Sequence, residues 1–215
     1  QGYIALITGN HDETPRLANG RSADMMKLIY LFLLTMPGTP FIYYGDEIGI
    51  HSRDLPSKEG GYTRTGARTP MQWSDEENAG FSKAKAEMLY LPVSDAKNRP
   101  TVADQDRDPD SLLNRVRKLI KLRHSQKALE ADAEFTVIYA ESGKLPFIYS
   151  RSKIGQKLLI AINPAAEAIS VNLPHNLFKA LPKVIYAPED AVITKGEDGW
   201  TLSLRPISGA VFDIS

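Results

Sequence analysis

The sequence predicts an α/β fold in its N-terminal half, followed by an all-β C-terminal region. Two observations support this: residues 3–45 follow a strand, helix, strand pattern, and the chain from residue 134 onward is a succession of short strands. The first pattern is a βαβ unit, whose two strands should pair in parallel through a right-handed crossover.

The βαβ unit begins with residues 3–9, a nearly continuous apolar run that is typical of a strand buried on both faces. Ser22 is then predicted to N-cap a helix with apolar residues at helical spacing. This helix should end before Pro37, because the residue before a proline is disfavoured in the α region. Residues 40–45 form the second strand.

A polar cluster follows each of these strands, at the carboxyl ends of the strands, where α/β proteins place their active sites. The first contains His11 and Asp12; an imidazole beside a carboxylate at a strand end suits action on a substrate. The alternative is a purely structural role, in which Asp12 caps the segment that follows the strand-end turn.

The second cluster, Asp46 and Glu47, could be an acid/base pair, but neighbours on a strand point to opposite faces. A structural role, bonding backbone amides, is therefore preferred for it.

Residues 46–108 are rich in glycine and proline but also contain aromatic residues, which favours a long ordered loop over a flexible linker. Asp108, as N-cap, and Pro109 should open a helix that extends to Ser125. Its basic residues are interpreted as a solvated face and not as a nucleic-acid patch, since the net charge is zero. These residues are Arg115, Arg117, Lys118, Lys121 and Arg123.

The C-terminal region is predicted to be an antiparallel β-sandwich, because short strands alternate with turn residues. The predicted strands are residues 134–139, 147–151, 157–163, 168–173, 184–187, 200–204 and 210–214. No catalytic cluster lies among them, and His175 beside a proline is interpreted as a turn residue. The region 134–215 is therefore assigned a structural role, with residues 126–133 as a linker.

Several ordered motifs resemble those of the α-amylase family of glycoside hydrolases (glycoside hydrolase family 13). Residues 9–16, with Gly-Asn-His-Asp at their start, resemble the seventh-strand motif, and residues 38–47 (GTPFIYYGDE) resemble the eighth-strand motif. Residues 64–73 (RTGARTPMQW) and 78–82 are similar to the loop after the eighth strand in the α-glucosidase, oligo-1,6-glucosidase and trehalose synthase branch. Residues 108–114 fit the start of the family's last barrel helix.

The resemblance implies that residues 1–125 are the C-terminal part of a (β/α)8 barrel, with its last two strands and the loop 46–108 over the barrel mouth. Residues 134–215 would be the family's C-terminal β domain. A complete barrel needs about 250 residues. Together with a start at Gln1, just before a strand, this leads us to expect a C-terminal fragment.

The resemblance also implies the roles of individual residues. Asp12 matches the third carboxylate, which stabilises the oxocarbenium-like transition state, and His11 matches a residue that binds the same sugar. Arg64 is expected to reach the innermost sugar site, and Arg68 to bind sugar as well or to brace the loop. The nucleophile and the general acid/base match strands that are absent from the chain, and no metal or cofactor is implied.

The implied function is retaining hydrolysis of α-glucosidic bonds in malto- or isomalto-oligosaccharides by the full-length enzyme, with the fragment alone inactive. Two alternatives share the quoted motifs. One is a trehalose synthase, which isomerises maltose. The other is a catalytically inactive relative that serves as a binding subunit, although the retained residues His11 and Asp12 count against it.

Composition excludes other classes of partner. The 26 basic and 26 acidic residues give no electrostatic basis for binding nucleic acid or an anionic membrane surface. The absence of cysteine excludes disulfides and thiolate chemistry and favours a reducing, cytoplasmic compartment. No apolar run approaches the ~20 residues of a membrane span. The exposed edges of strands 3–9 and 40–45 are expected to promote self-association.

Overall fold

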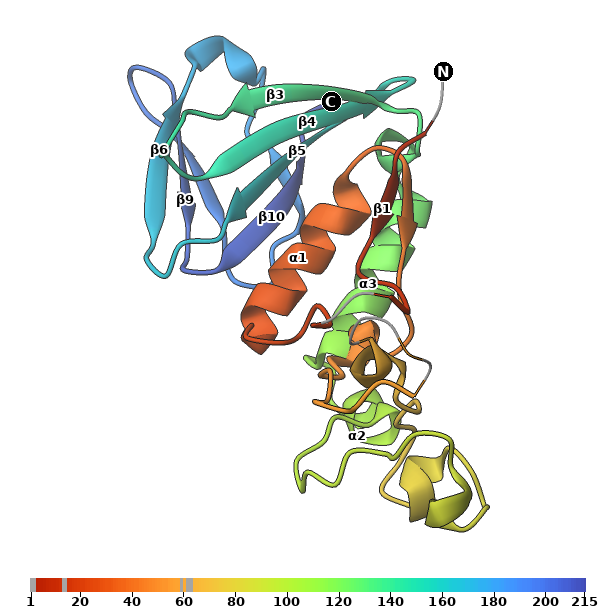
Figure 1. Ribbon diagram of the computed structural model, residues 1–215. Helices are drawn as coiled ribbons and strands as arrows, with labels where there is room; N and C mark the ends of the chain where they lie inside the picture. The colour runs from red at the N-terminus through yellow and green to blue at the C-terminus, as the bar shows by residue number, and fades with distance from the viewer. Residues whose placement is uncertain (1–2, 13–14, 59, 61–63) are drawn as a thin grey trace. The chain divides into compact units, whose positions relative to one another are not determined.

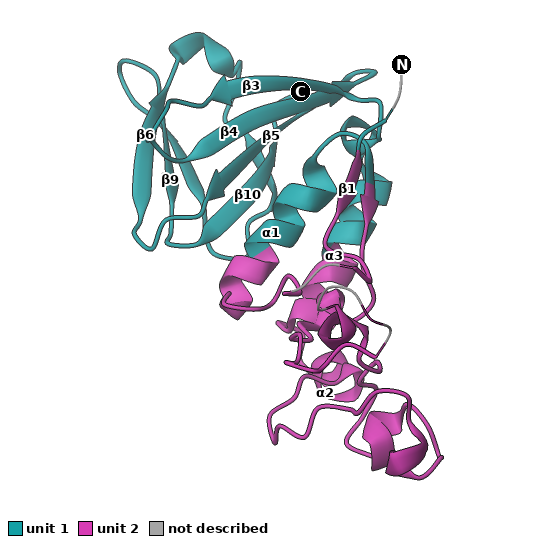
Figure 2. Cartoon of the chain, viewed as in Figure 1, with its two compact units in different colours: residues 1–4, 28–39, 119–215 teal, residues 5–27, 40–118 magenta. Residues whose placement is uncertain are grey.

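The computed structural model describes residues 3–12, 15–58, 60 and 64–215. These residues form two compact units, each built from several stretches of chain (Figure 2). Unit 1 consists of Gln1–Ile4, Leu28–Thr39 and Leu119–Ser215, and unit 2 consists of Ala5–Lys27 and Pro40–Lys118.

Unit 1 contains two antiparallel sheets (Figure 1). The five-stranded sheet has the order β3 (Glu134–Tyr139), β4 (Phe147–Lys153), β5 (Gln156–Asn163), β10 (Ser208–Asp213) and β7 (Lys183–Tyr186). The three-stranded sheet has the order β6 (Ile169–Leu173), β9 (Trp200–Leu204) and β8 (Val192–Lys195). Alternating apolar residues from both sheets share one hydrophobic cluster, which includes Leu159, Phe212, Trp200 and Leu202.

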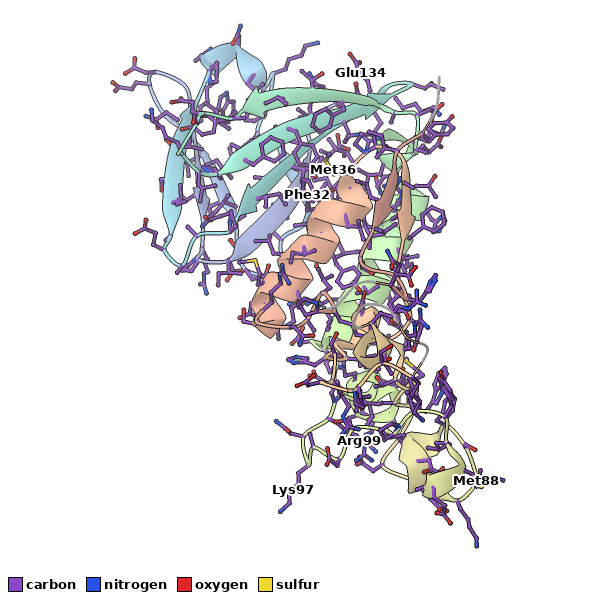
Figure 3. The ribbon with its side chains drawn as sticks, in the orientation of Figure 1. Phe32, Met36, Met88, Lys97, Arg99 and Glu134 are labelled. Atoms are coloured by element: carbon purple, nitrogen blue, oxygen red, sulfur yellow. The ribbon has the colours of Figure 1, made fainter. Side chains whose placement is uncertain are left out.

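Helix α1 (Ala23–Thr35) packs on the five-stranded sheet through its unit 1 part. Phe32 points toward the sheet (Figure 3) and lies 6.5 Å, centroid to centroid, from the rings of both Phe147 and Tyr149. At Gly209, an added Cβ would lie 2.6 Å from Leu31 Cδ2 and 2.9 Å from the Ala161 carbonyl oxygen, so a larger residue would force the helix or the strand to shift. This close approach lets the helix bury its apolar residues against β10.

Both predicted ends of α1 are confirmed. At the start, the Ser22 hydroxyl accepts a hydrogen bond from the Met25 amide at 3.2 Å, as an N-cap does. The helix ends at Thr35, before Pro37. Its last carbonyls are satisfied by arginines from far along the sequence: Arg123 donates to Leu34 at 2.8 Å, and Arg151 donates to Thr35 at 2.6 Å.

Strands β1 (Ala5–Ile7) and β2 (Thr39–Phe41) form a two-stranded sheet. The Thr39 amide donates to Ile4 and the Thr8 amide donates to Phe41, so both strands advance in the same direction. The predicted parallel βαβ unit is therefore confirmed. The predicted burial of the first strand on both faces is wrong for the described residues, because Ala5 and Ile7 are exposed and the strand pairs only with β2 among them.

The described part of the long segment after β2 packs through buried residues, in agreement with the predicted packed loop. It contains the 3-10 turns Asp46–Ile48, Thr65–Arg68, Glu77–Gly80 and Ala86–Met88. It ends in a short helix that the sequence did not predict, α2 (Val102–Arg107), whose Thr101 side chain accepts from the Asp104 amide. Ile48, Ile50, Met71 and Leu113 make up a hydrophobic cluster of unit 2.

Helix α3 (Leu112–Ser125) corrects two predictions. It ends at Ser125 as expected, but it begins at Leu112, because the Asp108 side chain closes a local turn by accepting from the Asp110 amide. The Ser111 hydroxyl caps the helix instead, by accepting from the Asn114 amide. The predicted solvated face is also only partly correct: Arg115 is 8% exposed and Arg123 donates to backbone carbonyls.

Two further differences concern unit 1. The sequence did not predict β8, which has only four residues, on the edge of its sheet. The expected linker 126–133 packs within the unit, since Ala128 and Leu129 are fully buried and Arg151 donates to the Glu130 carbonyl. The other C-terminal strands begin and end within two residues of their predicted bounds.

Limited trypsin digestion is expected to cut first at residues 83–97 of unit 2, where the chain is irregular and its lysines are exposed. Lys127 and Lys157 are also exposed, but the first lies next to buried residues and the second lies in a paired strand. Mass spectrometry of early products checks this order. Initial cleavage after Lys127 or Lys157 would contradict it.

Candidate active site

Asp12 lies just beyond the end of β1, in a turn formed by its neighbour. The Asp12 amide donates to Asn10 Oδ1 at 2.7 Å, so the Asn10 side chain, and not that of Asp12, closes the turn. The Asp12 carboxylate is thereby left to interact with other side chains. Its side chain is 38% exposed, so a ligand in solution can approach it.

The structure brings together all four residues that the sequence nominated. Asp12 Oδ1 accepts from Arg64 Nη1 at 2.7 Å and from Arg68 Nη2 at 3.0 Å. His11 Nε2 lies 3.3 Å from Asp12 Oδ2. Arg68 Nε also donates to the His11 carbonyl at 2.7 Å, so this arginine holds both members of the His-Asp pair.

These contacts keep Asp12 ionised. Desolvation would raise the pKa of its carboxyl, but the hydrogen bond from Arg64, the charge of His11 and the hydrogen bond from Arg68 oppose it. The pKa therefore lies below its ordinary value. A carboxylate that stays charged is suited to stabilise a cation that develops beside it.

A buried ion pair supports the loop that carries Arg64 and Arg68. Arg16 and Asp46 are 2% and 0% exposed, and Arg16 Nη1 lies 3.3 Å from Asp46 Oδ1. Arg16 also donates to the Ala67 carbonyl through Nε at 3.1 Å and Nη2 at 2.8 Å. Because Ala67 lies between Arg64 and Arg68, Arg16 anchors the 3-10 turn from which both arginines extend.

Asp46 has the structural role that the sequence favoured, for a different reason. Residues Asp46–Ile48 form a 3-10 turn and not a strand, and Asp46 bonds side chains and not loop amides. Its Oδ2 accepts from the Thr8 hydroxyl at 2.7 Å, which ties the ends of both strands together. Sequence reasoning missed Arg16, although it lies four residues after Asp12 within the first motif.

Tyr43 and Tyr44 enclose the Arg16 guanidinium, whose Cζ lies 4.7 Å from the centroid of each ring. Both contacts lie within cation–π range. Burial, followed by the neighbouring Tyr44, raises the pKa of Tyr43 to about 12. The two tyrosines thus pack around the ion pair.

Glu47 faces a different environment from Asp46. It lines an open pocket of about 450 Å³ together with Arg68 and the aromatic side chains of Trp73, Phe81 and Tyr90. Its Oε2 is buried and has no hydrogen-bond partner among the residues that the structure describes. Burial raises the pKa of this carboxyl. The sequence did not predict this pocket.

Neither a metal centre nor a membrane span is found in the described part of the chain. Its residues include no group of three or more His, Cys, Asp or Glu side chains that could hold a metal ion. None of its helices has the length and apolar character needed to cross a membrane.

The site lies in a region that matches a known family. Residues 1–132 match the model described as "Alpha amylase, catalytic domain". The match covers more than half of the sequence, so the chain belongs to the α-amylase family. This confirms the resemblance noted from the strand-end motifs.

Individual relatives point to α-glucoside enzymes. The chain is 34% identical over 183 residues to a salivary alpha-glucosidase of Aedes aegypti (78% of this chain, 30% of the relative). It is 30% identical over 214 residues to an oligo-1,6-glucosidase of Heyndrickxia coagulans (84% and 38%). A crystal structure of a trehalulose synthase superposes with a TM-score of 0.79 at 25% identity (99% and 43%). The chain therefore spans less than half the length of each.

The match supports a (β/α)8 barrel as the source of the βαβ unit, because the α-amylase catalytic domain contains that fold. The two parallel strands of this chain, and the site at their carboxyl ends, agree with the face that carries active sites in such barrels.

Proposed function

We propose that this chain is part of a retaining enzyme that hydrolyses α-glucosidic bonds of malto- or isomalto-oligosaccharides, with Asp12 as the transition-state stabiliser. The observation that carries the proposal is the convergence of Arg64, Arg68 and His11 on the Asp12 carboxylate. A charged, partly exposed carboxylate can hold sugar hydroxyls in hydrogen bonds that strengthen as positive charge develops on the sugar ring.

The neighbouring residues take distinct roles in this proposal. His11 and Arg64 contact the innermost sugar, since both lie beside Asp12 and carry donors for hydroxyl oxygens. Arg68 contributes to sugar binding and braces the site through the His11 carbonyl. The nucleophile and the general acid/base are supplied by other strands of the barrel, about 5–5.5 Å apart as retention requires.

The remaining domain assignments are proposals as well. Residues 1–125 form the end of the catalytic barrel, and residues 134–215 form a structural β-sandwich domain. The shared hydrophobic cluster of the two unit 1 sheets supports the second assignment. The absence of cysteine supports a cytoplasmic location for the enzyme.

The reaction class is tested with the full-length enzyme and an isomalto- or malto-oligosaccharide, by following the anomeric protons by NMR. The first product formed is expected to be the α-anomer, since a retaining enzyme inverts twice. Initial release of the β-anomer would contradict the proposal.

The similarity to a trehalose synthase of Thermus thermophilus, 30% identical over 191 residues, favours a trehalose synthase as the second candidate function. Product analysis on maltose separates the two: glucose indicates a hydrolase, and trehalose indicates the trehalose synthase alternative. A non-catalytic binding subunit is disfavoured because His11, Asp12 and both arginines form a complete local network. A substituted nucleophile in the full-length protein would establish that alternative.

The 215-residue chain alone is expected to hydrolyse neither p-nitrophenyl α-glucoside nor maltose nor starch. Sugar contacts without a nucleophile and a general acid give binding and not bond cleavage. The assay compares the purified chain with its Asp12→Asn variant and a buffer blank. Turnover by the parent chain that Asp12→Asn abolishes would show that the catalytic pair lies within it.

The same preparation tests self-association. Four apolar residues of the βαβ unit are 49–65% exposed: Tyr3, Ile4, Ile7 and Phe41. We propose that they drive oligomerisation of the isolated chain. Light scattering should report a mass above 23.8 kDa; a monodisperse monomer at all concentrations would refute this expectation.

A further inference from the structure

We infer that unit 2 carries an oxyanion-binding site, separate from the Asp12 site, that takes a phosphate group. The site is a pocket of about 330 Å³ whose polar lining includes His51, Arg53, Ser94, Asn98 and Arg99. The residues of the Asp12 site do not line it. All the lining residues belong to unit 2 and lie within the described part of the chain.

The arginine side chains that line the pocket carry positive charge. Two arginines line it, and its lining contains no carboxylate. The acidic partners of these arginines lie in solvent: Asp95 is 91% exposed and 3.5 Å from Arg53, and Asp75 is 76% exposed and 3.7 Å from Arg99. Exposed ion pairs of this length are weak, because water and salt screen them. The guanidinium charges are therefore available to an anion.

Arg99 has an unused donor. Its side chain is only 19% exposed, and its Nε is buried with no hydrogen-bond partner among the described residues. Buried donors are normally paired, so an unpaired one indicates a missing acceptor. The segment that carries Arg99 is held in place, since Gln72 Nε2 donates to the Pro100 carbonyl at 2.7 Å.

The second arginine is positioned by the chain as well. Arg53 Nη1 donates to the Val93 carbonyl at 2.6 Å, which fixes the segment that contains Ser94. Ser94 Oγ accepts from the Ala96 amide, so its hydroxyl hydrogen is available for donation. Arg53 from one segment, and Ser94 and Arg99 from another, thus line the same pocket.

This set of donors suits phosphate. The planar fork of a guanidinium matches two phosphate oxygens, and hydroxyl and amide groups add neutral donors. The pocket volume lies within the range of about 300–1,000 Å³ found for small-molecule sites. It leaves space for the sugar of a phosphorylated monosaccharide, so both inorganic phosphate and a sugar phosphate are probed.

The test is calorimetric titration of the full chain with inorganic phosphate, and separately with glucose 6-phosphate, at constant ionic strength. Saturable binding is expected, and Arg99→Met should weaken it at least tenfold. Lys97→Met is the matched control: it removes one positive charge two residues away, from a side chain that projects outward (Figure 3) and does not line the pocket. It should change the Kd less than twofold.

A second measurement needs no variant. Phosphate should protect Arg53 and Arg99 of the parent chain from phenylglyoxal, with the exposed Arg21 as the unprotected internal reference read by mass spectrometry. Tighter binding of glucose 6-phosphate than of phosphate identifies a sugar phosphate, and equal affinity identifies free phosphate. Lack of saturable binding, equal weakening by Lys97→Met and Arg99→Met, or lack of protection would each overturn the proposal.

Discussion

Asp12→Asn in the full-length enzyme is expected to lower kcat by about 10²–10⁴-fold, because it removes a negative charge directed at the cationic transition state. The amide has nearly the shape of the carboxylate, so substrate binding should change far less. The contacts of Asp12 also favour the charged form that the substitution removes, because two arginine donors and His11 lie beside its carboxylate. Initial rates on an α-glucoside, measured over a range of concentrations, separate kcat from KM.

The matched control is Asp24→Asn, which makes the same change at an exposed carboxylate in the first turn of α1. Its kcat should equal that of the parent enzyme. Circular dichroism establishes that both variants are folded. If Asp12→Asn retained a kcat close to that of Asp24→Asn, the proposed role of Asp12 would be wrong.

Arg16→Met is expected to have the largest effect on stability, about 3–5 kcal/mol, because it leaves Asp46 as an uncompensated buried charge. It also removes the donors that hold the Ala67 carbonyl. Urea unfolding of the parent and variant, with m-values compared, measures the change. Arg16→Lys should be less severe, since it retains the charge but loses the planar fork.

Two further variants make this prediction specific to the ion pair. Arg21→Met removes an exposed arginine that donates to nearby backbone carbonyls, and it should change stability by no more than about 0.5 kcal/mol. The double variant Arg16→Met, Asp46→Leu should recover much of the loss, because it removes both charges. Equal unfolding midpoints for Arg16→Met and Arg21→Met would exclude the proposed support role.

The sequence predicted the elements whose causes are local. Ser22 and Pro37 set the ends of α1 through capping and steric exclusion, and apolar runs between turn residues marked most strands of unit 1. Predictions failed where a neighbouring polar group competed or where the element was too short to show a pattern. Asp108 closes its own turn instead of capping α3, and β8 is too short an edge strand to give a clear pattern.

The candidate site shows the same limit. His11, Asp12, Arg64 and Arg68 could be nominated because they lie in recognisable motifs. Their contacts could not be derived, since 52 and 56 residues separate Asp12 from the two arginines. Arg16 was missed because its side-chain partners come from two separate segments, residues 44–46 and Ala67, which only the folded chain brings to it.

The two ends of α1 also differ in when they can be completed during synthesis. Ser22 caps the start from the adjacent residue, whereas Arg151 reaches the Thr35 carbonyl across 116 positions. At about 5–20 residues per second, a ribosome needs roughly 6–23 s to bridge that interval. The nascent helix therefore has an unfinished C-terminus until β4 has emerged. We therefore expect the docking of α1 on the five-stranded sheet to be completed late in synthesis.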